Sequence, residues 1–435
     1  MHLRAAAVAV ATAGLPLVLA ACSRDDGGPR GDAVQDAAIT CGAGGPRSDT
    51  VQDTAIRLTY GGFGLDLYRK IAAATPGENV FVSPLSAGLA FGMLYNGATG
   101  ATRKAMQETL GLGDIGTDLE AMNQANLALL EAMAAEDVEL AVGNSLWARE
   151  GVRFAPDFLA RNRAFYRAEV ETVDFTAPAA VNRMNEWASR STKGKIPTVA
   201  DGPLDPSLVL MLMNAVYFKG RWADEFEPSS TIPQAFHLED GSTIQTPMMT
   251  RLGGYGHLKG DGFSAVRIPY CGGRFAMYVF LPDSGRTLAA LRENVNADSL
   301  GLWMQRFGQT EVQLSLPRFT ARGTYDLVGP LRALGMAAVF DPARAELLAI
   351  APPESLGGRN LFVSRAQQRT FVEVNEEGTE AAAVTSEFVT SDTSITEPPV
   401  RFVADRPFFV AIRDDRTRAL LFVGQLMDPS ARSPE

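Results

Sequence analysis

The sequence predicts an α+β fold, because helical periods dominate the first half of the chain and strand-like runs dominate the second. Residues 311–316 alternate apolar and polar side chains, which predicts a strand with one face in water. Four other runs are apolar without alternation, which is typical of strands covered on both faces. These runs are residues 208–218, 275–281, 408–412 and 420–426.

Apolar side chains also recur at the spacing of an amphipathic helix. We expect the first helix to begin near residue 54, and the third to end before Gly194. The four helical patterns are Leu58/Phe63/Leu67/Ile71, Leu85/Leu89/Met93, Val181/Met184/Ala188 and Leu327/Leu331/Leu334.

No segment carries a motif of enzymatic chemistry. Beyond residue 22 the chain has only two histidines, His237 and His257, and it lacks Gly-x-Ser-x-Gly, His-Glu-x-x-His and Cys-x-x-Cys motifs. Residues 111–116 match Gly-x-Gly-x-x-Gly, but they follow a helical stretch rather than a strand, so we interpret them as a helix stop and a loop. We therefore expect no catalytic residue, no cofactor and no metal.

Length and charge limit the class of protein further. The chain has 435 residues, a formal net charge of −10 and a hydrophobic fraction of 46%. This is enough for one large or two ordinary domains with an ample core. The acidic balance argues against nucleic acid as a partner, because a phosphate backbone attracts basic surfaces.

The first 21 residues have the layout of a signal peptide. Arg4 precedes an apolar run, residues 5–21, which is too short for a membrane-spanning helix of about 20 apolar residues. The run ends in Leu19-Ala20-Ala21-Cys22, which resembles the bacterial lipobox, where the cysteine becomes the lipid-bearing N-terminus. We therefore expect lipid on Cys22 that anchors the exported protein to the cell envelope, on the periplasmic or cell-surface side. Cleavage without lipid, or an uncleaved anchor, is the alternative.

Residues 22–53 predict a flexible linker, because Gly, Asp, Ala and Pro dominate and no apolar periodicity is present. Residues 32–39 nearly duplicate residues 49–56, and we interpret the first copy as a tandem duplication that spaces the domain from the membrane. Besides Cys22 the chain has Cys41 and Cys271. We expect two unpaired thiols; a disulfide between them in an oxidising compartment is the alternative.

A long loop follows the strand-like residues 370–374. It begins Glu-Glu-Gly-Thr-Glu-Ala-Ala-Ala-Val-Thr-Ser at Glu376 and contains no Gly or Pro between Gly378 and Pro398. An ordinary loop has about 4–6 residues, and a flexible linker would be rich in Gly, Pro and Ser. The segment therefore predicts a loop that can become a strand, with a long surface loop or a disordered linker as the alternative. The small side chains on one face of the extended chain are Thr379, Ala381, Ala383 and Thr385.

Seven further segments support one family assignment because of their order along the chain. They are residues 79–86, 97–100, 144–147, 192–196, 214–222, 405–408 and 422–424. Together with the loop, they resemble the serpins, the serine protease inhibitor superfamily, over about residues 55–429. The resemblance implies a serpin domain at residues 54–435, with three β-sheets, about nine helices and an exposed reactive-centre loop at about residues 376–399.

By this resemblance the chain is an inhibitor of serine-type endopeptidases, or of a cysteine protease with similar acyl chemistry, and not an enzyme. A serpin acts as a suicide substrate: its cleaved loop inserts into the main sheet while the protease remains attached as an acyl-enzyme. The resemblance implies a metastable, extracellular monomer. The alternatives are a non-inhibitory serpin that binds or carries a ligand in the envelope, and an unrelated envelope enzyme.

The hinge of an inhibitory serpin carries small, uncharged side chains where the loop enters the sheet. By resemblance, Thr379 is the first side chain to insert. Glu387 departs from the pattern, because it falls on the inward-facing parity and burial of a lone carboxylate is costly. The hinge comprises Glu376, Gly378, Thr379, Glu380, Ala381, Ala382 and Ala383.

The resemblance also implies a polar cluster beneath the main sheet, where its strands part. The matching residues are Ser83, Ser86 and Asn214, and Gln368 stands where the family usually has a histidine. Glutamine both donates and accepts hydrogen bonds, so we expect the cluster to survive and its pH response to be lost. We expect Trp187 to pack near the point where the hinge enters, or else to be an ordinary core residue.

Family spacing places the bond that the target cleaves about fifteen residues after Gly378. This gives Asp392–Thr393, with Ser391–Asp392 and Thr393–Ser394 as the alternatives. Aspartate predicts a protease with a basic pocket for Asp or Glu, whereas serine or threonine predicts a small apolar pocket. No Arg or Lys lies in residues 379–399, so we expect a target that is not trypsin-like.

Overall fold

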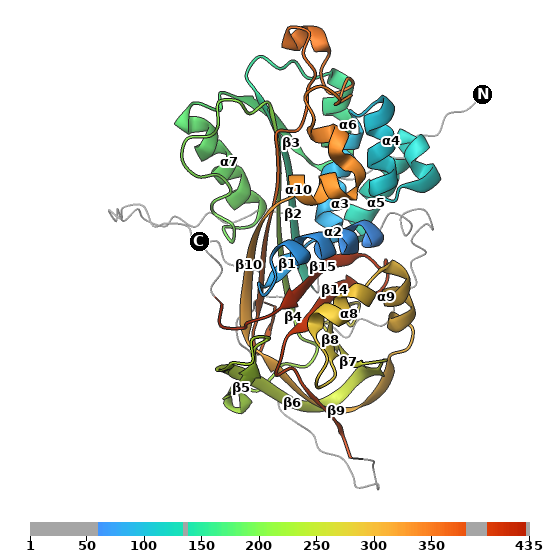
Figure 1. The fold of residues 1–435 in the computed structure, drawn as a ribbon, viewed down its shortest axis with the longest axis vertical. Coiled ribbons are helices and arrows are strands. Elements are labelled where there is room, and N and C mark those ends of the chain that lie inside the picture. Colours follow the sequence, from blue (N-terminus) through green and yellow to red (C-terminus); the bar gives the residue numbers. More distant parts are fainter. Residues whose placement is uncertain (1–59, 134–137, 380–397, 432–435) are drawn as a thin grey trace, which may run out of the picture. The chain divides into compact units, whose positions relative to one another are not determined.

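The computed structural model describes residues 60–133, 138–379 and 398–431. All of them belong to one compact unit, residues 39–435. Nine α-helices, α2 to α10, and fifteen strands, β1 to β15, lie in these residues (Figure 1). None of the described helices has the length and apolarity that a membrane crossing requires.

The main sheet has six strands in the order β10-β11-β12-β4-β2-β3. Its centre is unusual because β4 and β11 run parallel and pair directly with each other, and β12 separates them only at one end. The strands are β2 (Val138–Arg149), β3 (Glu169–Val173), β4 (Leu210–Arg221), β10 (Phe319–Asp326), β11 (Arg365–Val374) and β12 (Gly378–Thr379).

A second, nine-stranded sheet has the order β1-β15-β14-β8-β7-β6-β9-β13, with β5 also paired to β6. The second and third sheets that the resemblance implies are joined here, because the long β6 pairs with β7 at one end and with β5 at the other. The strands are β1 (Val80–Val82), β5 (Ile232–His237), β6 (Thr243–Lys259), β7 (Phe263–Pro269), β8 (Phe275–Pro282), β9 (Gly308–Pro317), β13 (Val400–Val403), β14 (Phe408–Asp414) and β15 (Leu420–Leu426).

Helices cover both faces of the main sheet. Helix α7 lies on one face, and α2 to α6 lie on the other (Figure 1). The helices are α2 (Gly61–Ala74), α3 (Pro84–Tyr95), α4 (Gly100–Thr109), α5 (Leu119–Met133), α6 (Pro156–Tyr166), α7 (Pro178–Ser191), α8 (Leu288–Asn294), α9 (Ala297–Met304) and α10 (Val328–Leu331).

Strand β4 shows why its sequence is apolar without alternation. Leu212, Val216 and Phe218 belong to the large core beneath the sheet, whereas Met213 and Tyr217 belong to a smaller cluster under α7. Because side chains on both faces of the strand are buried, consecutive residues can all be apolar. The expectation of a strand covered on both faces is confirmed. Full burial of each large side chain contributes roughly 1.5–3 kcal/mol.

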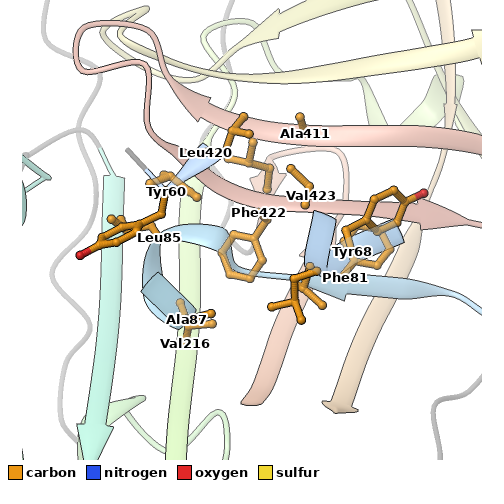
Figure 2. Packing of buried hydrophobic residues seen from close by; sticks show 14 of the residues in the cluster. Tyr60, Tyr68, Phe81, Leu85, Ala87, Val216, Ala411, Leu420, Phe422 and Val423 are labelled. Carbon is orange, nitrogen blue, oxygen red and sulfur yellow. The ribbon is translucent and has the colours of Figure 1, made fainter. Parts of the chain in front are cut away.

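The large core joins segments that are far apart in the sequence. Figure 2 shows Phe81 of β1, Leu85 of α3 and Phe422 of β15 among its members. The rings of Phe218 and Phe422 pack edge to face with centroids 6.4 Å apart. Helix α3 is buried on every side, which explains its weak amphipathic pattern.

Two local expectations have different outcomes. The helix predicted through Leu334 changes type: α10 stops at Leu331, and a π-helical turn continues past Leu334 to Gly335, whose φ of 116° a regular helix does not allow. Strand β9 is half exposed as predicted, with Val312 and Leu314 buried and Glu311 and Gln313 in water.

Candidate functional site

The hinge begins inside the main sheet. Thr379 pairs with Val374 of β11 on one side and with Gly220 of β4 on the other. Gly378 pairs with Arg221, and a Cβ atom at Gly378 would lie 2.7 Å from the Arg221 Cα. Only glycine fits at this close approach of two backbones, so the sequence position of Gly378 fixes where the hinge can enter.

An aromatic pair holds the inserted residues. Thr379 is fully buried, and its hydroxyl oxygen lies 2.7 Å from the Tyr270 hydroxyl oxygen. The Tyr270 ring stacks on Trp222 with centroids 4.7 Å apart. The Trp222 indole donates to the Asn375 carbonyl oxygen at 2.9 Å. Burial raises the pKa of Tyr270 and outweighs the lowering by the Thr379 hydrogen bond, so this hydroxyl stays protonated.

A tight turn connects β11 to β12. The Asn375 side-chain oxygen accepts hydrogen bonds from the backbone N–H groups of Glu377, at 3.1 Å, and Gly378, at 3.2 Å. The Asn375 N–H donates back to the Gly378 carbonyl oxygen at 2.9 Å. This side-chain turn reverses the chain and aims the hinge between the two strands.

Glu376 anchors the hinge to the rest of the domain. Its carboxylate accepts hydrogen bonds from Thr231, at 2.7 Å, and from Arg318, and its carbonyl oxygen accepts from the Phe226 N–H at 2.8 Å. Burial raises the pKa of Glu376, but the hydrogen bonds from Arg318 and Thr231 lower it more, so the pKa lies below its ordinary value. Its neighbour Glu377 has a raised pKa, because of burial and the nearby carboxylates.

Below the hinge, β4 and β11 close against each other. Seven residue pairs join them, from Phe371 opposite Tyr217 to Arg365 opposite Met211. Any further insertion of the loop along the path of β12 requires these pairs to separate. We call these seven pairs the seam.

The predicted polar cluster lies on the seam, where Gln368 pairs with Asn214. Gln368 accepts a hydrogen bond from the Ser83 N–H at 2.9 Å and donates to the Ser83 carbonyl at 3.1 Å and to the Asn214 side-chain oxygen at 2.7 Å. The Asn214 amide donates to the Ser86 hydroxyl at 2.5 Å and to the Asn144 side chain at 2.8 Å. The structure thus brings together Ser83, Ser86, Asn214 and Gln368, all buried.

Trp187 lies away from the point where the hinge enters, contrary to the expectation from sequence. It is on α7 and packs over Gly143 of β2, where an added Cβ would lie 3.1 Å from its ring. Gly143 pairs with Ala215, which is five residues from Gly220 along β4 and therefore about 16 Å from the hinge. The tryptophan beside the hinge is Trp222.

The expectation of an unpaired thiol at Cys271 is wrong, because this residue is disulfide-bonded. Cys271 is buried directly after Tyr270, and its N–H donates to the Arg221 carbonyl at 2.8 Å. The chain's other cysteines, Cys22 and Cys41, lie outside the described residues.

Several other predicted site residues also lie outside the described residues. They are Glu380, Ala381, Ala382, Ala383, Glu387, Asp392 and Thr393 of the loop. The signal peptide and the linker, residues 1–53, lie outside them as well.

Sequence reasoning missed several residues that hold the site. Asn144 and Trp222 lie within the segments that match the family, but the sequence did not predict which residues they contact. The Asn-x-x-Gly spacing of Asn375 and Gly378 is a turn signal that could have been read. Tyr270 and Arg318 carry no local signal, because the fold alone brings them to the hinge.

Comparisons with known proteins identify the family to which this fold belongs. The family model Serpin, serine protease inhibitor, matches residues 59–429. This chain belongs to the serpin family. Glia-derived nexin of Rattus norvegicus is 34% identical over 381 residues, which cover 84% of this chain and 91% of the nexin. Leukocyte elastase inhibitor of Sus scrofa is 33% identical over 378 residues, which cover 84% of this chain and 97% of that protein.

Solved serpin structures superimpose on the same domain. The thermophilic serpin tengpin in its native state has a TM-score of 0.79 at 26% identity and covers 88% of this chain and 96% of its own. Thyroxine-binding globulin in complex with thyroxine has a TM-score of 0.77 at 26% identity and covers 86% and 100%. The family includes protease inhibitors and binding proteins, and its members are not catalytic enzymes.

We expect Gln368→Ala to destabilise the native protein. The change leaves the buried Ser83 N–H without its hydrogen-bond acceptor and the Asn214 side-chain oxygen without its donor, and each unsatisfied buried group costs about 1–3 kcal/mol. In urea unfolding, the free energy of unfolding of the native protein should fall by about 2 kcal/mol or more.

Gln367→Ala is the matched control for this change. Gln367 is the adjacent buried glutamine on β11, and its side-chain oxygen accepts no hydrogen bond from the residues that the structure describes. We expect a clearly smaller loss for this variant. Equal losses in the two variants would contradict a specific role for the cluster.

Acidification should weaken the anchor at Glu376. A carboxyl group whose folded pKa is depressed stabilises the protein above its unfolded pKa, and the contribution is lost as the pH falls through the folded pKa. We expect the melting-temperature difference between wild type and Glu376→Gln to be constant at neutral pH and to shrink below about pH 5. Glu373→Gln is the control, since Glu373 forms no ion pair within the described part; a parallel shrinkage there would refute the assignment.

Proposed function

We propose that this chain inhibits serine-type endopeptidases as a suicide substrate, trapping the target as a covalent acyl complex. The observation that supports this most is the hinge: Gly378 and Thr379 already occupy the space between β4 and β11, and the seam below them is closed only by strand pairs and the polar cluster. A new strand can therefore extend along a path that is already begun.

The chemistry needs no catalytic residue from this chain. The target's nucleophile attacks the carbonyl carbon of the scissile bond, the peptide bond to the next residue breaks, and the new amine takes up a proton and leaves. The hinge side of the loop remains joined to the protease as an acyl ester. Once the loop is cut, its hinge side is no longer tied to β13, and it inserts as the seam opens.

Insertion then competes with hydrolysis of the ester. The inserted loop gains ladder hydrogen bonds to both β4 and β11 and buries every second side chain. The protease is carried along, and displacement of its catalytic groups by about 1 Å can slow deacylation 10²-fold. The native chain is thus a kinetically trapped state above a more stable inserted form.

A non-inhibitory role as an envelope binding or carrier protein is the second candidate. Two features of the sequence favour it: the charged Glu387 among the loop residues expected to face inward, and Gln368 where the family usually has a histidine. The structural likeness to thyroxine-binding globulin favours it as well. The hydrogen bonds of Gln368 to both sides of the cluster weigh against it, because they replace the usual histidine without leaving a buried group unsatisfied.

We place the reactive bond at Asp392–Thr393 by family spacing. The target is then a protease with a basic pocket for Asp or Glu, or, if the bond lies one residue to either side, one with a small apolar pocket. The absence of Arg and Lys from residues 379–399 supports a target other than a trypsin-like enzyme.

The full chain mixed with Asp-specific, Glu-specific and elastase-like serine proteases should form a complex of the summed mass that survives denaturing gels. Mass spectrometry should find a released peptide that starts at Thr393, and trypsin should form no such complex. Clean cleavage of the loop with every protease left active, and no gain in heat stability, would sink the inhibitor proposal and leave the non-inhibitory one.

Thr379→Arg is the variant that separates trapping from simple cleavage. A guanidinium cannot replace the buried hydroxyl beside Tyr270 without a large desolvation cost. The variant should still be cleaved but should trap at least tenfold less protease. Thr320→Arg, on an exposed position of β10, should trap as wild type does.

We also propose that the protein is a lipoprotein, exported by the signal peptide at residues 1–21 and anchored through lipid on Cys22. The lipobox-like Leu-Ala-Ala-Cys sequence supports this. Cells that express the full chain with labelled palmitate should incorporate the label, and Cys22→Ala should abolish it. Equal labelling of the variant would refute lipidation at Cys22, and unlabelled wild type would refute lipidation as such.

A further inference from the structure

The outer face of β5, β6, β9 and β13 carries a hollow of about 680 Å³. These strands lie together in the second sheet, beyond the hinge end of the main sheet (Figure 1). Ile232 of β5, Leu252 of β6, Gln313 of β9 and Arg401 of β13 line the hollow, and Glu227 borders it.

Two large apolar side chains are exposed in this hollow. Ile232 is 54% exposed and Leu252 is 52% exposed, and both are among the four exposed large hydrophobic residues of the described part of the chain. The other two, Leu302 and Leu348, do not line it. Apolar side chains gathered in a hollow with a polar rim are typical of a protein interaction site.

The rim carries charges that are free to pair with a partner. Arg401 and Glu227 are exposed, and neither forms an ion pair within residues 60–133, 138–379 and 398–431. Arginine is enriched where protein partners bind, and exposed charges of opposite sign around a hollow favour one orientation of a partner.

The hollow lies between the two ends of the reactive-centre loop. On one side, Thr231, which binds the Glu376 carboxylate, directly precedes Ile232. On the other side, the loop returns into β13, where Arg401 pairs with Gln313. From Asp392 to Arg401 the chain reaches at most about 30 Å, and a protease of about 230 residues has a radius of gyration of about 17 Å. A protease that attacks the loop therefore sits within reach of the hollow.

We propose that this hollow is a second docking surface for the target protease, which rests on the proposed inhibitory function. The protease contributes a surface loop with one apolar side chain, which packs between Ile232 and Leu252. An acidic side chain of the same loop meets Arg401, and a basic one meets Glu227. This contact adds to the selectivity that the reactive-centre loop provides. It accelerates association with proteases that carry such a surface loop, whereas other proteases react through the scissile bond alone.

The test uses the full chain and the serine protease of the panel that forms the covalent complex fastest with the wild type. We expect the double variant Ile232→Ser/Leu252→Ser to lower the second-order rate of complex formation at least tenfold. Arg401→Ala should lower it several-fold, with a weaker dependence on salt than wild type. The stoichiometry of inhibition should not change, because it depends on the ratio of the insertion rate to the rate of ester hydrolysis, both of which follow docking.

Leu302→Ser is the matched control, since Leu302 is 63% exposed on α9 and outside the hollow. Its rate should equal that of wild type. Rates of the hollow variants within twofold of wild type would overturn the docking surface and leave the inhibitory function intact. No covalent complex with wild type would overturn both proposals. A wild-type dimer in sedimentation that Leu252→Ser dissociates would assign the hollow to a second copy instead and overturn it.

Discussion

The seam between β4 and β11 is the constraint on which the rest of the structure depends. The two strands are parallel, and their seven residue pairs close a sheet that the hinge has already begun to part. Strand β12 is antiparallel to both neighbours. Extension of β12 therefore exchanges one parallel interface for two antiparallel ones, which are more stable per residue. In the proposed mechanism, the closed seam of the native fold opposes this exchange.

The polar cluster makes the seam stronger than its ladder alone. Gln368 on β11 and Asn214 on β4 bond to each other and to Ser83 and Ser86 at the start of α3, so the two strands and the helix share one buried network. Opening the seam at this level exposes unsatisfied amides before new partners arrive, and such groups are costly in a medium of low dielectric constant. In the proposed mechanism, the network thus raises the barrier to insertion rather than stabilising the inserted state.

The sequence predicted strands that are buried on both faces, such as β4, but it did not predict features that depend on contacts between distant residues. The apolar run of β4 identified a doubly covered strand because each face has its own cluster. Periodicity placed Leu334 in a helix but did not reveal that its turn is π-helical, with a positive φ at Gly335. The family resemblance gathered Ser83 and Gln368 across 285 residues, which spacing could not do. It placed Trp187 near the hinge, and only the fold shows that Trp222, in the matching segment 214–222, is the tryptophan that contacts it.

In the proposed insertion, the anchor at Glu376 would stay in place and would not oppose the movement of the loop. Its partners, Thr231 and Arg318, lie on the connections before β5 and β10 and not on the seam. They need not move when β4 and β11 part. Gly378 and Thr379 already lie between β4 and β11, and a side chain at Gly378 would collide with the backbone of β4. In the proposed insertion, the residues that travel therefore begin after Thr379, and β12 lengthens without release of the Glu376 anchor.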